Sequence, residues 1–532
     1  MAAARAATTV TPRMVRREIS DFHRVQERRR RQLPRALLVG LLAGLVAVAF
    51  RGSLEWLDRL RDRAVEAAHL HPLWYLPPLL ALTAFGAGAA VFLVQRYAPE
   101  ASGSGIPHVK AVLHNVRAMR WGRILVVKFL GGVCGIGAGL VLGREGPTVQ
   151  MGAAVGAMVG GWFASTPRER RALIAAGSGA GLAAAFNAPL AGLVFVLEEV
   201  QRDFAPGVFA TTLFASATAD VTTRLLLGQL PVFHVGSTTI PPLATLPASL
   251  LTGLLAGGLG VAFNRGLLAS LDFFQGLRGR PGWVYASAVG FGVGLVAWVL
   301  PHAVGGGEGL VAATLDGQIP WWALPPYFVL RFALTMASYG CGAPGGIFAP
   351  LLVLGSEIGL GVGKLGHWLF PLAMDHPETF AVVGMAAYFA GIVRAPLTGI
   401  VLIVEMTGNY SLVLPLLVAC LTAYGVADFL GDQPVYEALL ERDLLRSHAA
   451  PEPDGAQILD FTVAPGADFV GKTVRELGLP PGAILISLRR GLSVQVPVAA
   501  SCLEVGDHVT VLIAPEAAEA ISILKRGLSG RA

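Results

Sequence analysis

The stretch FNAPLAGLVFVLEEV, residues 186–200, returns as VRAPLTGIVLIVEMT at residues 393–407. Ala-Pro-Leu, the following glycine and a glutamate stand in register in the two copies, so that Glu198 matches Glu405. A second pair of segments, GREGPTVQMG from Gly143 and GIFAPLLVLG from Gly346, repeats at nearly the same spacing of roughly 200 residues. Two echoes at one spacing indicate a chain built from two related halves.

The composition places both halves in a lipid bilayer. The 532 residues are 54% hydrophobic and only 14% charged, whereas about 25% of an average soluble domain is charged. Several apolar segments are shorter than the roughly 20 residues that a spanning helix needs, and many are interrupted by Gly or Pro. We therefore predict an all-α polytopic membrane protein of tilted and broken helices in two inverted repeats, the architecture of many transporters. The alternative is that the glycines only let helices pack closely.

The segment before the first apolar run is strongly basic and is predicted to stay in the cytoplasm. Residues 1–35 carry nine arginines between Arg13 and Arg35, which by the positive-inside rule fixes this end on the cytoplasmic side. These arginines fit lipid headgroups better than nucleic acid, and no nucleic-acid partner is expected. The four cysteines and eleven histidines show no disulfide or metal-ligand spacing, so neither a metal nor a cofactor is predicted.

Three Gly/Pro motifs mark helix starts inside the membrane domain, which is predicted to span residues 36–445. They are GSGIP at 103–107, GREGP at 143–147 and GIFAP at 346–350. A helix that starts inside the membrane points unpaired backbone N–H groups and its positive dipole end into the break. Such an end is an anion site. Arg144 and Glu145 of the second motif are costly at this depth, which calls for a compensating interaction.

The same motifs carry a specific resemblance. GSGIP, GREGP and GGIFAP stand complete and in family order, and QPVYEALL at 433–440 resembles the segment with a pore tyrosine, so the chain resembles the CLC family of chloride channels and chloride/proton exchangers. The resemblance covers about residues 35–445. It implies a homodimer in which each subunit has its own ion pathway.

The resemblance also implies the groups that bind chloride. Carried over residue by residue, they are the hydroxyl of Ser104, the phenol of Tyr436 and the backbone N–H groups of Ile347 and Phe348. All four are neutral donors, and a full positive charge would hold the anion too tightly to release it. Without the family pattern, Ser104 would be interpreted as a helix cap and Tyr436 as an interfacial belt residue.

Two glutamates are expected to carry protons. Glu145 lies one residue into a helix start that attracts anions, so its carboxylate can occupy a chloride position when ionised and swing aside when protonated. Arg144 is expected to add positive potential or a structural hydrogen bond rather than to contact the anion. Glu199 aligns with Met406 and has no counterpart in the other half, and the resemblance makes it the internal proton-transfer residue. Its alternative is a charged residue at the membrane boundary.

The chain changes character after Leu445. A polar linker at 446–457 precedes a predicted small α/β domain at 458–532, with strands at 483–491, 492–498 and 508–515 and helices at 470–479 and 516–527. VRELGLPPGAILISLRRG and LEVGDHVTVL resemble the C-terminal regulatory module of potassium-uptake (TrkA-C, RCK-type) proteins. The expectation is a regulatory domain with an unidentified small-molecule ligand, or a passive assembly domain.

Taken together, the sequence predicts a homodimeric chloride/proton antiporter in the inner membrane, with both termini cytoplasmic. A passive chloride channel with the same anion site is the nearest alternative. A ligand-regulated cation transporter would need carbonyl and carboxylate ligands in place of these donors. An enzyme is not expected, because no arrangement of nucleophile, base and oxyanion donors is visible.

Overall fold

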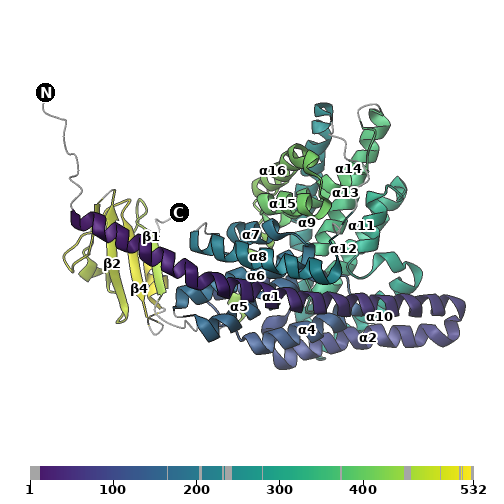
Figure 1. The fold of residues 1–532 in the computed structure, drawn as a ribbon, viewed down its shortest axis with the longest axis horizontal. Helices are drawn as coiled ribbons and strands as arrows, with labels where there is room; N and C mark the ends of the chain where they lie inside the picture. Colours follow the sequence, from purple (N-terminus) through teal and green to yellow (C-terminus); the bar gives the residue numbers. More distant parts are fainter. Residues whose placement is uncertain are drawn as a thin grey trace. The chain divides into compact units, whose positions relative to one another are not determined.

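The computed structural model describes residues 12–164, 166–202, 206–229, 233, 242–277, 279–371, 374–447, 457–491, 493–514, 517 and 519–528. The chain divides into two compact units, residues 1–109 with 120–439 and residues 110–119 with 440–532. Figure 1 shows a helical part and a smaller part that contains a β-sheet. The arginines between residues 13 and 31 lie outside the residues whose side chains are described.

Two successive sets of helices form the membrane domain. The first set is α1 (Pro12–Leu70), α2 (Pro72–Tyr97), α3 (Ile106–Leu113), α4 (Trp121–Gly137), α5 (Glu145–Phe163), α6 (Pro167–Phe186), α7 (Pro189–Phe195) and α8 (Pro206–Leu227). The second set is α9 (Leu246–Gly276), α10 (Gly282–Val299), α11 (Glu308–Leu315), α12 (Leu324–Gly340), α13 (Phe348–Leu369), α14 (Thr379–Val393), α15 (Pro396–Thr407) and α16 (Val413–Phe429). Helix α17 (Val435–Ser447) follows.

The three predicted helix starts are confirmed. Helices α3, α5 and α13 begin at Ile106, Glu145 and Phe348, each within its Gly/Pro motif. Proline stands in the first turn of each, where its missing N–H costs no intrahelical bond. Helices α7 and α15 likewise begin on Pro189 and Pro396.

The two sets of helices repeat the same close contacts. A Cβ added to Gly40 of α1 would lie 2.3 Å from the carbonyl oxygen of Ala215 in α8, and one added to Gly253 of α9 would lie 2.5 Å from that of Ala419 in α16. The glycines therefore do allow close helix packing, and they do so at equivalent places in two structural repeats. Helix α10 also lies along α2, although the two are far apart in sequence (Figure 1).

The repeated glutamates join the halves by reciprocal helix capping. The carboxylate of Glu405 accepts hydrogen bonds from the backbone N–H groups of Leu190 (3.1 Å) and Ala191 (2.7 Å) at the start of α7. In return, Glu198 accepts from the N–H groups of Leu397 (3.0 Å) and Thr398 (2.6 Å) at the start of α15. Each negative charge thus meets the positive end of the other repeat's helix.

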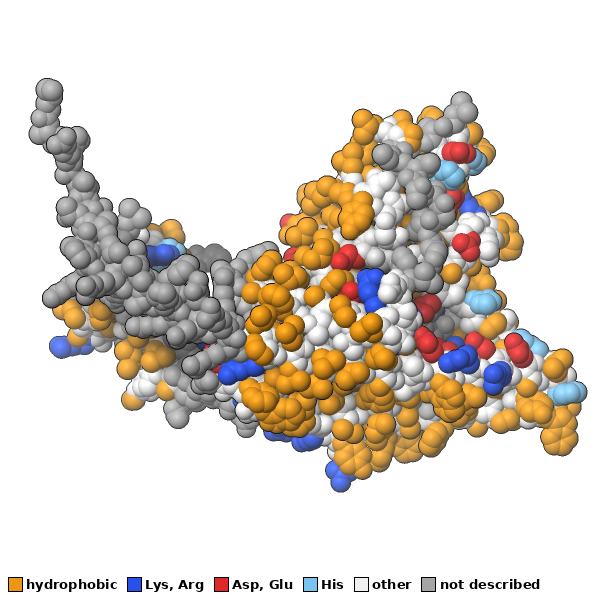
Figure 2. Space-filling model, viewed as in Figure 1, with side chains coloured by type: hydrophobic (Ala, Val, Ile, Leu, Met, Phe, Trp, Pro, Cys, Tyr) orange, Lys and Arg blue, Asp and Glu red, His pale blue; other side chains and the backbone are white. Residues whose placement is uncertain are grey.

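The outer surface of this domain is apolar. Among the described residues, six helical stretches are long and apolar enough to cross a membrane: Gln32–Leu70, Pro72–Tyr97, Leu243–Gly276, Gly282–Val299, Phe348–Leu369 and Tyr410–Phe429. Figure 2 shows apolar side chains over much of one face and charged ones in few places. The chain is a multi-pass membrane protein.

The C-terminal domain is a small antiparallel sheet with one helix. Its strands are β1 (Gln457–Thr462), β2 (Ala483–Arg490), β3 (Ser493–Gln495) and β4 (His508–Ile513), in the spatial order β1-β4-β2-β3, with α18 (Glu519–Leu528) beside them. The three predicted strands and the last helix are confirmed, although β3 is short. Residues 448–456 of the predicted linker lie outside the described residues.

One prediction for this domain is wrong, and one strand was not predicted. The helix predicted at 470–479 is a single 3-10 turn, Val474–Leu477. A capping box of Thr473 and Glu476 starts it, and Gly478 in the left-handed region (φ 60°) ends it. Strand β1 was not predicted, because its first residue, Gln457, belongs to the polar segment assigned to the linker.

An ion pair fixes the turn before β4. Asp507, whose side chain is 1% exposed, accepts two hydrogen bonds from Arg490, at 2.9 and 2.8 Å, and one from the backbone N–H of Glu504 at 2.8 Å. The Arg490 guanidinium lowers the pKa of Asp507 below its usual value. Asp507 is therefore a structural residue of the turn.

The first prediction concerns the reciprocal caps. Glu405→Gln removes a negative charge from the start of α7 and is expected to lower the free energy of unfolding by about 1–2 kcal/mol. Thermal unfolding of the protein in detergent micelles, followed by tryptophan fluorescence, measures the loss. Glu66→Gln, an exposed position on α1, serves as the control. Equal unfolding temperatures for Glu405→Gln and wild type would contradict the capping role.

The second prediction concerns Asp507. Because its folded pKa is depressed, its contribution to stability is complete above the unfolded pKa of about 3.9 and is lost as pH falls through the folded value. Asp507→Asn should cost the C-terminal domain about 2 kcal/mol at pH 7. Hydrogen exchange of β2 and β4 in the full-length protein should show a difference from wild type that shrinks below pH 4. A difference that does not depend on pH would count against the ion pair.

Candidate anion site and its carboxylates

Backbone hydrogen bonds hold the three Gly/Pro motifs together. Gly143 and Gly346 exchange two N–H to carbonyl bonds of 2.7 Å each, and the N–H of Gly345 donates to the carbonyl of Gly103 at 3.0 Å. The starts of α3, α5 and α13 consequently meet at one place. The predicted site residues from motifs more than 200 residues apart are thus brought together.

Close approach of the backbones requires glycine at this junction. A Cβ added to Gly346 would lie 2.9 Å from the backbone nitrogen of Gly146, and a Cβ added to Gly146 would lie 2.9 Å from the carbonyl oxygen of Ser104. Both distances are shorter than the non-bonded contacts that a Cβ atom normally makes with backbone atoms. Any side chain here would push the helix starts apart.

Ser104 is buried at the start of α3. Its hydroxyl oxygen accepts a hydrogen bond from the backbone N–H of Ile106 at 3.3 Å, and its own N–H donates to the Tyr339 hydroxyl at 3.4 Å. Ser104 therefore caps the start of α3, the role that the sequence suggested as the alternative to anion binding. It does not exclude anion binding, because the hydroxyl accepts in the cap and keeps its proton to donate.

Ile347 and Phe348 form the first turn of α13. Both residues are completely buried, and the first N–H groups of any α-helix have no partner within the helix. The Phe348 ring is fixed by contacts with the rings of Phe186, Phe195 and Phe389, at centroid distances of 5.9, 5.8 and 4.6 Å. This aromatic cluster holds the helix start in place.

Tyr436 presents a buried phenol. It is 0% exposed, and its hydroxyl has no hydrogen-bond partner among the described residues. The groups that act on it electrostatically are Tyr339, Glu199 and Glu145. A buried hydroxyl without a partner costs about 1–3 kcal/mol. An anion between Tyr436 and the helix start would supply the missing acceptor. Burial also shows that Tyr436 is not an interfacial belt residue.

Glu145 occupies the start of α13 with its carboxylate. The side chain is buried, and its carboxylate lies near the backbone nitrogen of Ala349, because a Cβ added to Gly143 would lie 2.2 Å from Glu145 Oε2 and 3.0 Å from that nitrogen. The Oε2 atom of Glu145 has no hydrogen-bond partner among the described residues. A negative charge from α5 thus sits at the end of α13 that attracts anions.

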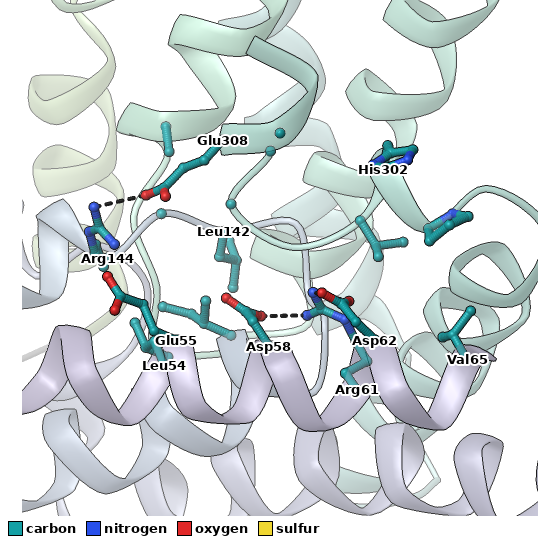
Figure 3. Close-up of a pocket in the computed structure, with 18 of the residues that line it drawn as sticks. Leu54, Glu55, Asp58, Arg61, Asp62, Val65, Leu142, Arg144, His302 and Glu308 are labelled. Carbon is teal, nitrogen blue, oxygen red and sulfur yellow. Dashed lines mark hydrogen bonds and ion pairs between the residues drawn. The ribbon is translucent and has the colours of Figure 1, made fainter. Parts of the chain in front are cut away.

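Arg144 lines a cavity at the start of α5. Its Nη2 atom pairs with Glu308 Oε1 at 2.8 Å, and the arginine side chain is only 9% exposed. The cavity has a volume of about 470 Å³ and is lined by α1, the loop before α5 and the segment 301–309. Figure 3 shows Arg144 and Glu308 above Glu55 and Asp58 of α1. We call this cavity the vestibule; Glu145 lies on its wall.

Glu199 lies elsewhere, in a π-helical segment, Val196–Val200, at the end of α7. Its side chain is 1% exposed, and Arg202, which is 45% exposed, approaches it at 3.6 Å. The same arginine pairs with Glu437, the neighbour of Tyr436. Glu199 is therefore not an exposed residue at a membrane boundary. It is a buried carboxylate beside the half-exposed Arg202.

The sequence analysis missed three residues of this region. The Tyr339 hydroxyl accepts from the backbone N–H of Ser104, Glu308 pairs with Arg144, and Arg202 contacts both Glu199 and Glu437. Only Tyr339 gives a sequence signal, since it closely precedes the GGIFAP motif. The contacts of Glu308 and Arg202 depend on tertiary structure that no local pattern encodes.

The chain matches a known protein family over most of its length. The voltage gated chloride channel (CLC) family matches residues 85–428. The chain belongs to the CLC family. The H(+)/Cl(-) exchange transporters ClcA of Klebsiella pneumoniae (strain 342) and Salmonella paratyphi A (strain ATCC 9150 / SARB42) are 42% and 40% identical over 426 residues. These matches cover 78% of this chain and 89% of each relative.

A solved CLC structure confirms the fold. The crystal structure of a slow cyanobacterial Cl⁻/H⁺ antiporter is 36% identical and superposes with a TM-score of 0.76, covering 79% of this chain and 99% of the other. The C-terminal domain matches the TrkA-C domain over residues 458–524. The resemblance of each part of the chain is thus confirmed.

The third prediction tests the buried phenol. Tyr436→Phe removes one neutral donor and should weaken chloride binding about threefold to tenfold, since a hydrogen bond to a charged group contributes about 1 kcal/mol or more. Isothermal titration of the detergent-solubilised protein with chloride measures the affinity. Tyr388→Phe is the matched control, because that buried phenol donates to the carbonyl of Leu259. Equal affinities for Tyr436→Phe and Tyr388→Phe would remove Tyr436 from the site.

Proposed function

We propose that this protein exchanges chloride for protons across the membrane, with Glu145 as gate and external proton carrier. The observation that carries the proposal is the position of the Glu145 carboxylate near the backbone N–H of Ala349, in the first turn of α13. A helix terminus inside a membrane attracts one negative charge. The carboxylate and a chloride ion therefore compete for this place.

Protonation decides that competition. When ionised, the carboxylate is attracted to the backbone N–H groups at the helix start. When protonated, it loses its charge and with it this attraction. Chloride can then take its place, with Ile347, Phe348, Ser104 and Tyr436 as neutral donors. Each cycle of protonation and deprotonation of Glu145 accordingly moves a proton across the membrane in one direction and lets chloride cross in the opposite direction.

The proton needs a second carrier on the opposite side, and we assign this role to Glu199. Its carboxylate is buried, acts electrostatically on Tyr436 and is approached at 3.6 Å by Arg202, a half-exposed side chain. An intramembrane carboxylate without a structural counterpart in the other repeat fits a proton relay. The exchange activity named for relatives of 40–42% identity supports this assignment.

The orientation and assembly belong to the same proposal. The basic N-terminus places the start of α1 in the cytoplasm of a cell with the protein in its inner membrane. The far end of α1, which lines the vestibule, then faces outward.

We further propose a homodimer, supported by Leu190 and Leu397, which are half exposed beside the two reciprocal caps. The TrkA-C domain would act as a cytoplasmic regulatory module with a small-molecule ligand.

The fourth prediction tests coupling. In liposomes whose potential is clamped by valinomycin and potassium, a chloride gradient should drive protons uphill. Glu199→Gln should abolish proton movement while chloride flux persists, and Glu145→Gln should also make chloride flux independent of pH. Glu378→Gln, outside the site, should behave like wild type.

Two results would overturn the proposal in different ways. Chloride flux without proton movement in the wild type would make the protein a passive channel. Proton movement that survives Glu145→Gln would remove the gate from the proton path.

A further inference from the structure

The vestibule has the wrong charge for a simple chloride entrance. Its lining holds six carboxylates but only two guanidiniums, with two imidazoles near its rim: Glu55, Asp58, Asp62, Glu66, Glu145 and Glu308; Arg61 and Arg144; His69 and His302. A cleft of negative potential lowers the local concentration of anions and raises that of cations, protons included. The vestibule therefore favours the proton rather than the chloride.

Four of these carboxylates form one stripe on α1. Glu55, Asp58, Asp62 and Glu66 are spaced by three or four residues, which places them on one helix face. Arg61 compensates part of the stripe, since it pairs with Asp58 at 2.7 Å and with Asp62 at 3.5 Å. Figure 3 shows this arginine between Asp58 and Asp62, with the stripe turned toward the cavity.

Glu308 is connected to the gate through Arg144. Its carboxylate is 56% exposed and pairs at 2.8 Å with Arg144, the residue that directly precedes Glu145. Glu55 and Asp58 also act electrostatically on Arg144, whereas Asp62 and Glu66 lie outside that set of groups. A chain of alternating charge, Glu308, Arg144 and Glu145, thus leads from solvent to the gate.

The backbone holds Glu308 in a defined place. It is the first residue of α11 and follows Gly307, whose φ of 82° lies in the left-handed region. The buried guanidinium of Arg331 donates to the carbonyls of Ala303 (3.1 Å) and Gly306 (3.3 Å) in the preceding loop. A Cβ on Gly307 would lie 2.4 Å from Arg331 Nη2. This loop is built to fix the position of the carboxylate.

We propose that Glu308 is a positioning residue for the gate, which by pairing with Arg144 lets Glu145 accept protons that the acidic vestibule gathers. The inference rests on the proposed function, because it assigns Glu308 a part in protonating the gate. Without Glu308, the charge of Arg144 would be less compensated beside the Glu145 carboxylate and would favour its ionised form.

The charges around Glu308 give the sign of its effect. Arg144 and Glu145 face it from α5, the stripe with Arg61 and His69 faces it from α1, His302 lies on the segment before it, and Arg331 lies beneath its loop. Removing the negative charge of Glu308 strengthens the attraction of Arg144 for Glu145 and removes a repulsion on Glu145. Both changes favour the ionised, closed gate.

The fifth prediction follows. Chloride efflux from liposomes is measured against external pH for wild type, Glu308→Gln, Glu308→Asp and the matched control Glu66→Gln. Glu308→Gln should move the external pH of half-maximal flux downward by roughly half a pH unit or more. Glu308→Asp keeps the charge and should stay near wild type. Glu66→Gln makes the same charge change away from Arg144 and should shift the midpoint much less.

Several results would overturn the inference. If Glu308 is purely structural, Glu308→Gln will lower flux at every pH and leave the midpoint unchanged. If Glu308→Gln and Glu66→Gln shift the midpoint equally, the effect comes from the total charge of the vestibule and not from the pairing of Glu308 with Arg144. If Glu308→Gln does not fold, Glu55→Gln must give a smaller downward shift; no shift there would also contradict the proposal. The midpoint is read from chloride flux, so a protein that moves chloride without protons would refute exchange and still test Glu308.

Discussion

Unpaired N–H groups at helix starts inside a membrane impose the constraint from which the rest of this structure follows. Hydrocarbon offers them no partner, so the protein must supply negative charge. It does so with carboxylates: Glu405 at α7, Glu198 at α15 and Glu145 at α13. The first two are structural and tie the repeats together. In the proposed mechanism a proton neutralises the third, so that the carboxylate at this helix start also serves as the gate.

Duplication explains how one solution came to serve both stability and transport. Each repeat carries a Gly/Pro break, a glycine-packed helix pair and a capping glutamate, and the caps are exchanged between the halves. Function lies where the repeats differ. Glu145 has Phe348 as its counterpart at the helix start, and Glu199 has Met406. In the proposed mechanism, one repeat provides both proton carriers and the other provides the helix end that receives the anion.

Much of this could be predicted from the sequence, because helix breaks, repeats and motif order are local patterns. The starts of α3, α5 and α13 and the shared structural role of Glu198 and Glu405 follow from such patterns. The pairing of Arg144 with Glu308 could not be predicted, since those residues are far apart in sequence and only the fold brings them together. The turn at 474–477 was mistaken for a helix because its apolar spacing looks helical, whereas its cap and glycine limit it to one turn.

The central claim is that the Glu145 carboxylate and a halide ion compete for the start of α13. The most direct measurement is anomalous diffraction from bromide-soaked crystals of wild type and Glu145→Gln. The account predicts a bromide peak in Glu145→Gln at the position that the carboxylate holds in the wild type, beside the N–H of Ala349. Bromide that is absent from this helix start in Glu145→Gln, or that sits there together with an unmoved wild-type carboxylate, would contradict it.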